Sequence, residues 1–291
     1  MLLILQILLG AGAGVTSIRF FADYIKNKEK DFPASKFYGT AAASAVINIF
    51  EALGIGNMAP MTVLMKGGRL IDDDRNFPGT INVSVCMPVF LEGFIYMTTI
   101  EVDYLTLVIN VIGCIAGGVI GVKVVEKLPV EPIRIIIGFA LLLAATFMLL
   151  GKLDLMPAGG ELIGLTGGKL ALSFVLEIII GMAGCMGVGC FSLQMCMLYF
   201  LGMSAAVCFP IMMSAAAFLQ ITNCNGFITT GQYVRKVAMA FNITGMIGIM
   251  IGAFVIGSMD TSTLQWLVCF IVYFAGALLL VQTFYGMKNA Q

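Results

Sequence analysis

The sequence predicts an all-α, polytopic membrane protein built from two inverted repeats and one final helix. Of its 291 residues, 60% are hydrophobic and 11% charged, whereas soluble domains average about 45–50% and 25%. Long apolar runs follow one another along the chain, and helices span lipid because they satisfy their own backbone hydrogen bonds. A third observation is an internal duplication. The composition excludes a soluble enzyme.

The duplication is carried by motifs that recur about 132 positions apart. The segment 54–60 reads GIGNMAP and the segment 187–193 reads GVGCFSL, while Phe77-Pro78 recurs as Phe209-Pro210. Gly and Pro interrupt helices. Interruptions at corresponding positions of two halves are the best sequence indication of a transporter's binding site.

Nine apolar runs bound the candidate helices. They are 1–25, 37–66, 78–99, 103–126, 132–152, 168–201, 205–229, 235–258 and 263–286. The second and sixth would form helices of roughly 45–50 Å, against a hydrocarbon core of about 30 Å. Both contain the Gly-rich motif near the middle. We therefore expect each of them to be a re-entrant hairpin, which enters and leaves the membrane by the same face.

Basic residues test this topology, because they concentrate in short cytoplasmic loops. The clusters are Lys26, Lys28, Lys30 and Lys36; Lys66, Arg69 and Arg75; Lys123, Lys127 and Arg134; Arg235 and Lys236; and Lys288. With two re-entrant hairpins all of these clusters lie on one side, whereas nine single crossings would place the loop at 66–76 outside. We expect seven full crossings and two hairpins, with the N-terminus outside and the C-terminus in the cytoplasm.

This topology defines the domains. Residues 1–130 form repeat 1, residues 131–262 form repeat 2, and residues 263–291 form a final transmembrane helix with a short tail. Each repeat is a helix, a broken-helix hairpin and two further helices. Since each crosses the membrane three times, the second is inverted relative to the first, as in many alternating-access transporters. The alternative is duplication without carrier activity, as in a channel.

The hairpins supply a candidate anion site. Asn57 and Ser192 can each cap a half-helix, and the two helix N-termini carry partial positive charge. The candidate substrate-binding residues are Gly54, Gly56, Asn57, Thr80, Asn82, Gly187, Gly189, Cys190, Ser192, Gln194 and Ser214. The alternative is that the glycines allow close helix packing and the polar side chains make interhelical hydrogen bonds.

Carboxylates inside the membrane cost about 2.5–3.5 kcal/mol at a helix centre, so they indicate function. Glu51 precedes the first Gly turn and Glu92 lies in the third run, and either is a candidate proton-coupling residue. We expect Glu177 to be hydrogen-bonded near an aqueous edge. We expect Arg19 to extend to the cytoplasmic face.

Other classes of function find less support. Histidine is absent and no HExxH or Ser/His arrangement occurs, so the chain does not resemble an enzyme, and we expect no cofactor and no metal. Sixteen basic and sixteen acidic residues cancel, so the expected partners are lipid and a small anion rather than nucleic acid. Twenty Met and the cluster Met195-Cys196-Met197 leave a Cu(I) transporter as an alternative.

Three segments carry a family resemblance. At 52–60, 78–83 and 209–215 the chain resembles the sulfite exporter TauE/SafE family of bacterial permeases, and the similarity runs over most of the length. The resemblance implies a permease for sulfur-containing or small organic anions in a bacterial inner membrane. The second hairpin departs from the family pattern in having no Pro like Pro60. Cys190 stands there instead, either as a thiol contact for a sulfur-containing ligand or as a small turn residue.

Overall fold

In the computed structural model, nearly all of the described chain is α-helical. The described residues are 2–27, 32–53, 57–73, 76–99, 101–124, 135, 138–139, 141–143, 145–146, 149–150, 153, 160–185 and 190–289. Among them, strand-like pairing is confined to an isolated bridge between Leu162 and Met203. The expected helix at 132–152 falls mostly outside this set.

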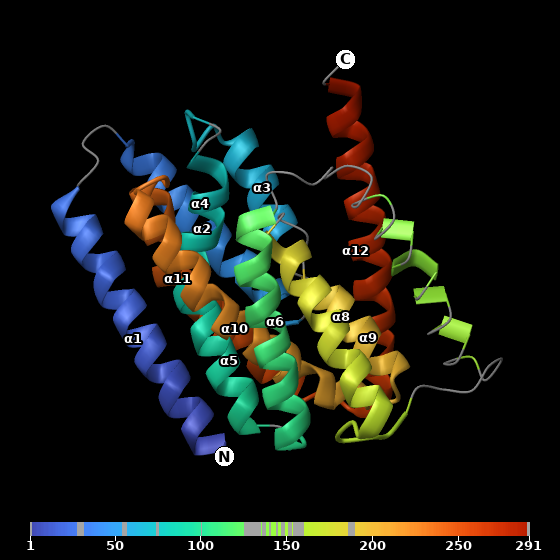
Figure 1. Cartoon of the computed structure of the whole chain (residues 1–291). Coiled ribbons are helices and arrows are strands. Elements are labelled where there is room, and N and C mark those ends of the chain that lie inside the picture. Colours follow the sequence, from blue (N-terminus) through green and yellow to red (C-terminus); the bar gives the residue numbers. More distant parts are fainter. Residues whose placement is uncertain are drawn as a thin grey trace. The chain divides into compact units, whose positions relative to one another are not determined.

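The helices follow the apolar runs (Figure 1). They are α1 (Leu2–Lys26), α2 (Ala34–Ala52), α3 (Met58–Gly67), α4 (Phe77–Ser84), α5 (Cys86–Thr99), α6 (Tyr104–Val124), α8 (Gly167–Cys185), α9 (Cys190–Phe200), α10 (Ala205–Thr230), α11 (Arg235–Gly257) and α12 (Thr261–Asn289). Within the described residues, α1, α6, α8, α10 and α11 are long and apolar enough to cross a membrane. The all-α membrane class is confirmed, while the count of seven crossings stays a prediction.

Both long runs consist of two helices. The run 37–66 forms α2 and α3, and the run 168–201 forms α8 and α9. α8 begins and ends 133 positions after α2, at 167 against 34 and at 185 against 52. The run 78–99, expected to be one span, also consists of two helices, because α4 ends at Ser84 and α5 begins at Cys86.

Each hairpin is closed by the same kind of hydrogen bond, from a lysine side chain to a backbone carbonyl. The Lys36 ammonium, in the first turn of α2, donates to the carbonyl of Arg69, just past the end of α3, at 2.6 Å. The Lys169 ammonium, in the first turn of α8, donates to the carbonyl of Leu201, just past the end of α9, at 2.8 Å. The outer ends of α2 and α3 therefore meet, and so do those of α8 and α9. A cation at these sites also complements the negative C-terminal end of a helix dipole.

The ends of α3 and α9 carry matching helix caps. The residues after the two ends, Arg69 (φ 46°) and Gly202 (φ 102°), have left-handed backbone conformations. The N–H of Leu70 bonds to the carbonyl of Met65 at 2.9 Å, and the N–H of Met203 bonds to that of Leu198 at 3.1 Å. This six-to-one bond defines a Schellman cap. The second copy uses Gly at the left-handed position, where the first tolerates Arg at a steric cost.

The chain forms two compact units. Unit 1 comprises Met1–Leu53, Asn57–Thr99 and Met213–Gly257, and unit 2 comprises Gly54–Gly56, Ile100–Met212 and Ser258–Gln291. Unit 1 thus contains α11, and unit 2 contains α6. The expected repeat boundaries at 130 and 262 describe sequence duplication rather than packing, and they stay a prediction.

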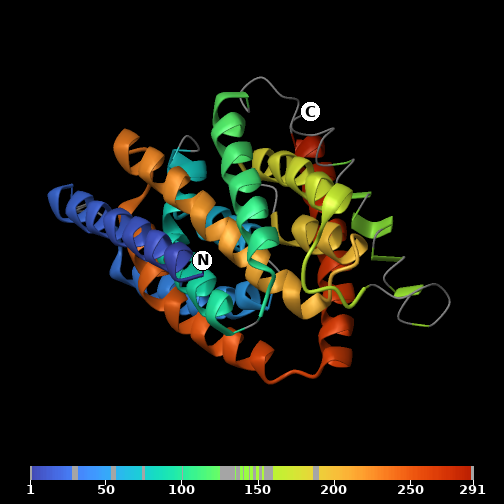
Figure 2. The same cartoon turned by 60° about the horizontal axis from the view of Figure 1, so that its bottom comes forward.

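In unit 1, α11 lies along α2 (Figure 2). The helices approach so closely that a side chain at Gly248 would collide with the carbonyl of Ala45, and one at Gly252 would lie 2.7 Å from the carbonyl of Ile49. Small residues permit such approach between membrane helices. The other face of α11 exposes Ile247 and Phe254, as expected for a lipid-facing surface.

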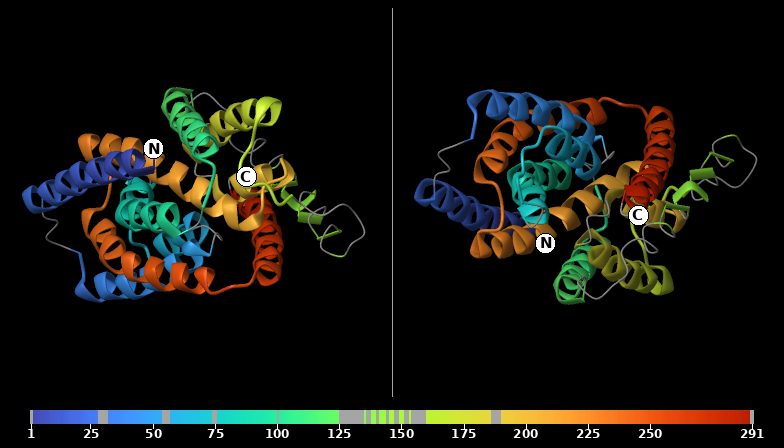
Figure 3. Two further views of the ribbon diagram at one scale, coloured as in Figure 1. Left: turned by 90° about the horizontal axis from the view of Figure 1, so that it is seen from below. Right: turned by 90° about the horizontal axis from the view of Figure 1, so that it is seen from above.

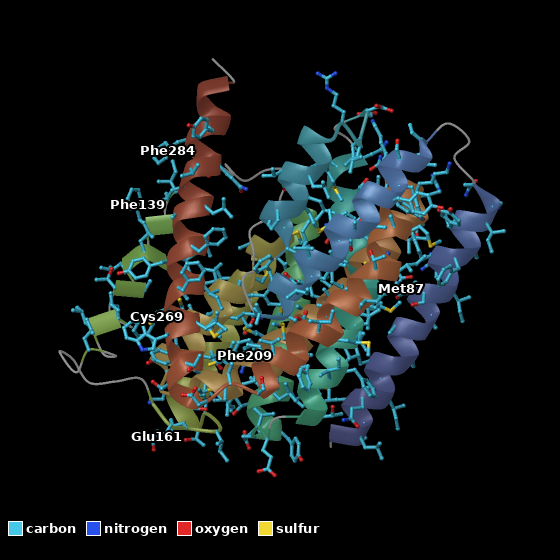
Figure 4. The ribbon with its side chains drawn as sticks, turned by 180° about the vertical axis from the view of Figure 1, so that it is seen from behind. Met87, Phe139, Glu161, Phe209, Cys269 and Phe284 are labelled. Atoms are coloured by element: carbon cyan, nitrogen blue, oxygen red, sulfur yellow. The ribbon has the colours of Figure 1, made fainter. Side chains whose placement is uncertain are left out.

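Asn242 of α11 bridges the break between α4 and α5. Its Oδ1 accepts from the N–H of Met87 at 2.9 Å, and its Nδ2 donates to the carbonyl of Val83 at 2.8 Å. These two backbone groups would bond to each other in an unbroken helix. Figure 4 labels Met87 at this position. Pro88, the next residue, has no N–H to continue the helix, so a side-chain amide replaces the missing backbone bond.

In unit 2, α6 lies along α8 (Figure 3). A side chain at Gly117 would collide with the carbonyl of Ile178, and one at Gly181 with that of Cys114. At the start of α12, Asp260 accepts from the backbone N–H groups of Ser262 and Thr263. Hydrogen bonds from the Thr263 side chain and from these N–H groups lower the pKa of Asp260 below its usual value.

Candidate functional site

The first hairpin places a carboxylate at the start of a helix. Gly54 and Gly56 lie outside the described residues, but the residues on both sides of them are described. The backbone N–H of Asn57 donates to the carboxyl group of Glu51. Glu51 is 1% exposed and Asn57 2%. The first N–H groups of a helix have no partner within the helix and carry partial positive charge. The start of α3 therefore binds a carboxylate, supplied by its own chain.

Glu92 of α5 lies beside Glu51. The Tyr96 hydroxyl, one turn beyond Glu92 on the same face, donates to the carbonyl of Ala52 at 2.8 Å. One turn before Glu92, Pro88 and Asn48 both approach Gly245 of α11. The two glutamates lie between these two contacts. Their carboxyl groups interact electrostatically.

This carboxyl pair has buried acceptor atoms without hydrogen-bond partners among the described residues. Within the described part of the chain, both Glu92 oxygens, Glu51 Oε2 and the Oδ1 of Asn48 have no hydrogen-bond partner. The Nδ2 of Asn57 is also free there. Two neighbouring buried carboxylates repel each other when both are ionised. The pair is suited to hold a proton.

The other expected residues of unit 1 make interhelical hydrogen bonds. The Thr80 hydroxyl accepts from the N–H of Val234 at 3.0 Å, which ties α4 to the start of α11. The carbonyl of Asn82 accepts from the Cys224 thiol of α10 at 3.2 Å, and its Oδ1 accepts from Asn223. Ser214 is fully buried on α10. For Thr80 and Asn82, the described contacts are those of the packing alternative.

In unit 2, the second hairpin presents Gln194 to a carboxyl group. Gly187 and Gly189 lie outside the described residues, as does the side chain of Ser192. The Cys190 thiol, at the start of α9, donates to the carbonyl of Ile180 at 3.7 Å. Gln194 Nε2 donates to Glu177 Oε2 at 2.9 Å and to the Cys114 sulfur at 3.9 Å.

Two further charged residues make contacts between helices. Glu177 is hydrogen-bonded to Gln194 and fully buried, because Gly113 of α6 lets α8 approach until a side chain there would lie 2.9 Å from Glu177 Cβ. Its expected place near an aqueous edge stays a prediction. Arg19 donates to Asn225 at 2.6 Å and to Thr229 at 2.8 Å, and so ties α1 to α10. Its expected extension to the cytoplasmic face stays a prediction.

The sequence reading missed the buried asparagines. Asn48, Asn110 and Asn242 are each 0% exposed on α2, α6 and α11. The available signal was their occurrence in apolar runs, where a primary amide must find partners. Asn110 and Asn242 also lie at the offset of the duplication, at corresponding positions of the two halves.

No three side chains of His, Cys, Asp or Glu come together as a metal site in the described ranges. Comparisons with known protein families, with curated proteins and with solved structures gave no match.

Proposed function

We propose that the chain is a secondary transporter that moves a small anion across the membrane by alternating access, with Glu51 and Glu92 as the proton-coupling pair. The observation that carries the proposal is the hydrogen bond from the start of α3 to the Glu51 carboxylate. A helix end inside an apolar protein that already holds one carboxylate has the chemistry to hold another anion.

The duplicated hairpins support a carrier rather than a simple bundle. Each long apolar run folds back so that its ends meet, at Lys36 with Arg69 and at Lys169 with Leu201. A segment whose ends meet enters and leaves the membrane by one face. Two such segments in repeats of opposite orientation give the two equivalent gates that alternating access needs. This topology places the N-terminus outside and the C-terminus in the cytoplasm.

Glu51 also supplies a coupling mechanism. When its carboxylate is ionised, it occupies the Asn57 N–H that an anionic substrate would use. Protonation weakens that hydrogen bond and frees the helix end, since a charged acceptor binds an N–H about twice as strongly as a neutral one. The free Asn57 Nδ2 adds a second donor. Proton and anion therefore bind together, and Glu92 beside them receives or returns the proton.

The substrate class follows from the resemblance to TauE/SafE permeases. We propose a sulfur-containing anion of the sulfite, thiosulfate or sulfonate type, carried across a bacterial inner membrane, with Cys190 as a contact for its sulfur atom. Gly54, Gly56, Gly187, Gly189, Ser192 and Ser214 stay candidate contacts for the substrate.

The test is uptake into liposomes that contain the purified protein. We expect at least one of sulfite, thiosulfate, a sulfonate and a carboxylate to accumulate when the outside is acidic, and labelled substrate to exchange against unlabelled substrate. Asn57→Leu should abolish this uptake while leaving the protein folded, because the helix end loses a donor. The matched control is Asn27→Leu, at an exposed position. Flux without counterflow would indicate an anion channel, and full uptake by Asn57→Leu would contradict the site.

A further inference from the structure

Unit 2 contains a second buried polar cluster, which the anion site does not use. We name it the acid–amide cluster and define it as Asn110, Glu177 and Gln194. All three side chains are 0% exposed. Each has one oxygen with no hydrogen-bond partner among the described residues: Asn110 Oδ1, Glu177 Oε1 and Gln194 Oε1.

The helices bring these residues within about one helical turn of one another in unit 2. α6 and α8 run in the same direction, because Gly113 meets Phe174 and Glu177 while Gly117 meets Ile178 and Gly181. Gln194 joins the two helices through Glu177 and Cys114. Asn110 lies one turn before Cys114 on the same face of α6. Its Nδ2 donates to the Thr106 carbonyl at 2.7 Å. Its Oδ1 is the side-chain atom that has no hydrogen-bond partner among the described residues.

The free atoms specify the chemistry of a ligand. All three are acceptors, so a donor or a cation satisfies them, whereas an anion would be repelled. The cluster contains one carboxylate and two neutral amides, and no cationic side chain is hydrogen-bonded to it in the described set, so a single positive charge neutralises it. Carboxylate and amide oxygens are hard ligands, which suit alkali and alkaline-earth ions rather than Cu(I). A proton on Glu177 would add one donor for three acceptors, whereas a cation can be coordinated by several oxygens at once.

A series of polar side chains connects the cluster to the N-terminal start of α6. Asp103, half-buried just before α6, accepts from the N–H and hydroxyl of Thr106 at 2.8 and 2.7 Å. Thr106 is one turn before Asn110, and its hydroxyl also accepts from the N–H of Leu165. Polar side chains thus follow one face of α6 from a loop to Glu177. A cation could be passed along these oxygens without contact with lipid.

We propose that the acid–amide cluster is a binding site for one monovalent alkali cation, and that Na⁺ is its ligand. Glu177 neutralises the ion, and the amide oxygens of Asn110 and Gln194 complete its inner contacts together with oxygens that the ion would recruit. Na⁺ sites built from carboxylates and carbonyl oxygens occur where transporters couple substrate movement to an ion gradient. This site does not depend on which anion is carried.

The test is equilibrium binding of radioactive Na⁺ to the purified full-length protein at mildly alkaline pH, without any anionic substrate. We expect saturable binding of one Na⁺ per chain. Glu177→Gln should weaken it by about 100-fold or more, because a buried charge loses its only compensating partner. Glu161→Gln is the matched control, since Glu161 is an exposed carboxylate of the same unit, labelled in Figure 4. Glu92→Gln should also leave Na⁺ binding unchanged.

A second readout keeps the proposal testable if Glu177→Gln fails to fold. Na⁺ should raise the thermal unfolding midpoint of the unaltered protein above that measured in choline at equal ionic strength, because a ligand stabilises the state that binds it. Absence of saturable Na⁺ binding, equal unfolding midpoints in Na⁺ and choline, or binding that survives Glu177→Gln would each overturn the proposal. Proton binding by Glu177 with no Na⁺ binding would do the same.

Discussion

At the residue scale, both proposed sites contain buried side-chain oxygens that accept no hydrogen bond from the described residues. Three glutamates, at positions 51, 92 and 177, are buried in apolar surroundings. Rarity in apolar runs was enough to identify Glu51 and Glu92 from sequence. It was not enough to separate them from Glu177, since its environment depends on Gly113 and Gln194, which no local pattern connects to it. Burial of a carboxyl group is a property of packing, not of the residues next to it.

Glu92→Gln tests whether the carboxyl pair serves transport rather than stability. The substitution preserves shape and removes one of two buried carboxyl groups that interact electrostatically, so we expect the free energy of unfolding to change by no more than about 0.5 kcal/mol, or to rise. Uptake driven by a pH gradient should lose its dependence on that gradient. Thermal unfolding and liposome uptake measure the two effects.

Glu101→Gln, at an exposed loop position, is the control for that substitution. An unfolding free energy lowered by several kcal/mol would show that Glu92 has a structural role. Unchanged pH dependence of uptake in Glu92→Gln would remove it from the coupling mechanism.

At the element scale, helix interruptions were predictable where length alone forced them. The runs 37–66 and 168–201 are too long for single crossings, and both are broken near the Gly motifs. The run 78–99 has the length of one crossing, so its length gives no such signal, although Pro88 is a local one. The two backbone groups at its break are bonded by Asn242, which is 155 positions away in sequence from Met87. Long-range side-chain to backbone bonds of this kind cannot be read from local periodicity.

Asn242→Ala tests the account of that break. The N–H of Met87 and the carbonyl of Val83 would lose their partner in a buried environment, at about 1–3 kcal/mol for each group left unsatisfied. We expect a loss of about 2 kcal/mol in the free energy of unfolding, because side-chain hydrogen bonds in membranes measure lower than in water. Chemical denaturation in detergent gives the value.

The control for Asn242→Ala is Asn27→Ala, which removes an exposed amide hydrogen-bonded to Asp23. Its effect should stay within about 0.5 kcal/mol. If both substitutions cost the same small amount, the bridge by Asn242 does not stabilise the break.

At the scale of the whole molecule, the duplication extends beyond the motifs that reveal it in the sequence. The matched Schellman caps after α3 and α9 and the matched lysine bonds of Lys36 and Lys169 are repeated details of local geometry. Lys169 is not among the basic residues that orient the chain, and its bond to Leu201 gives it a structural role. The pairing of α6 with α8 and of α11 with α2 was not predictable, since both pairs join helices assigned to different repeats.

The most direct measurement of the central claim is the sidedness of the two hairpins, by labelling single introduced cysteines with a membrane-impermeant maleimide, relative to the unaltered protein. Ser35→Cys and Asp72→Cys flank the first hairpin, while Thr166→Cys and Leu201→Cys flank the second. We predict that the first two react only from the cytoplasmic face and the last two only from the opposite face. Reaction of Ser35→Cys and Asp72→Cys from opposite faces would contradict the re-entrant hairpin and with it the proposed mechanism.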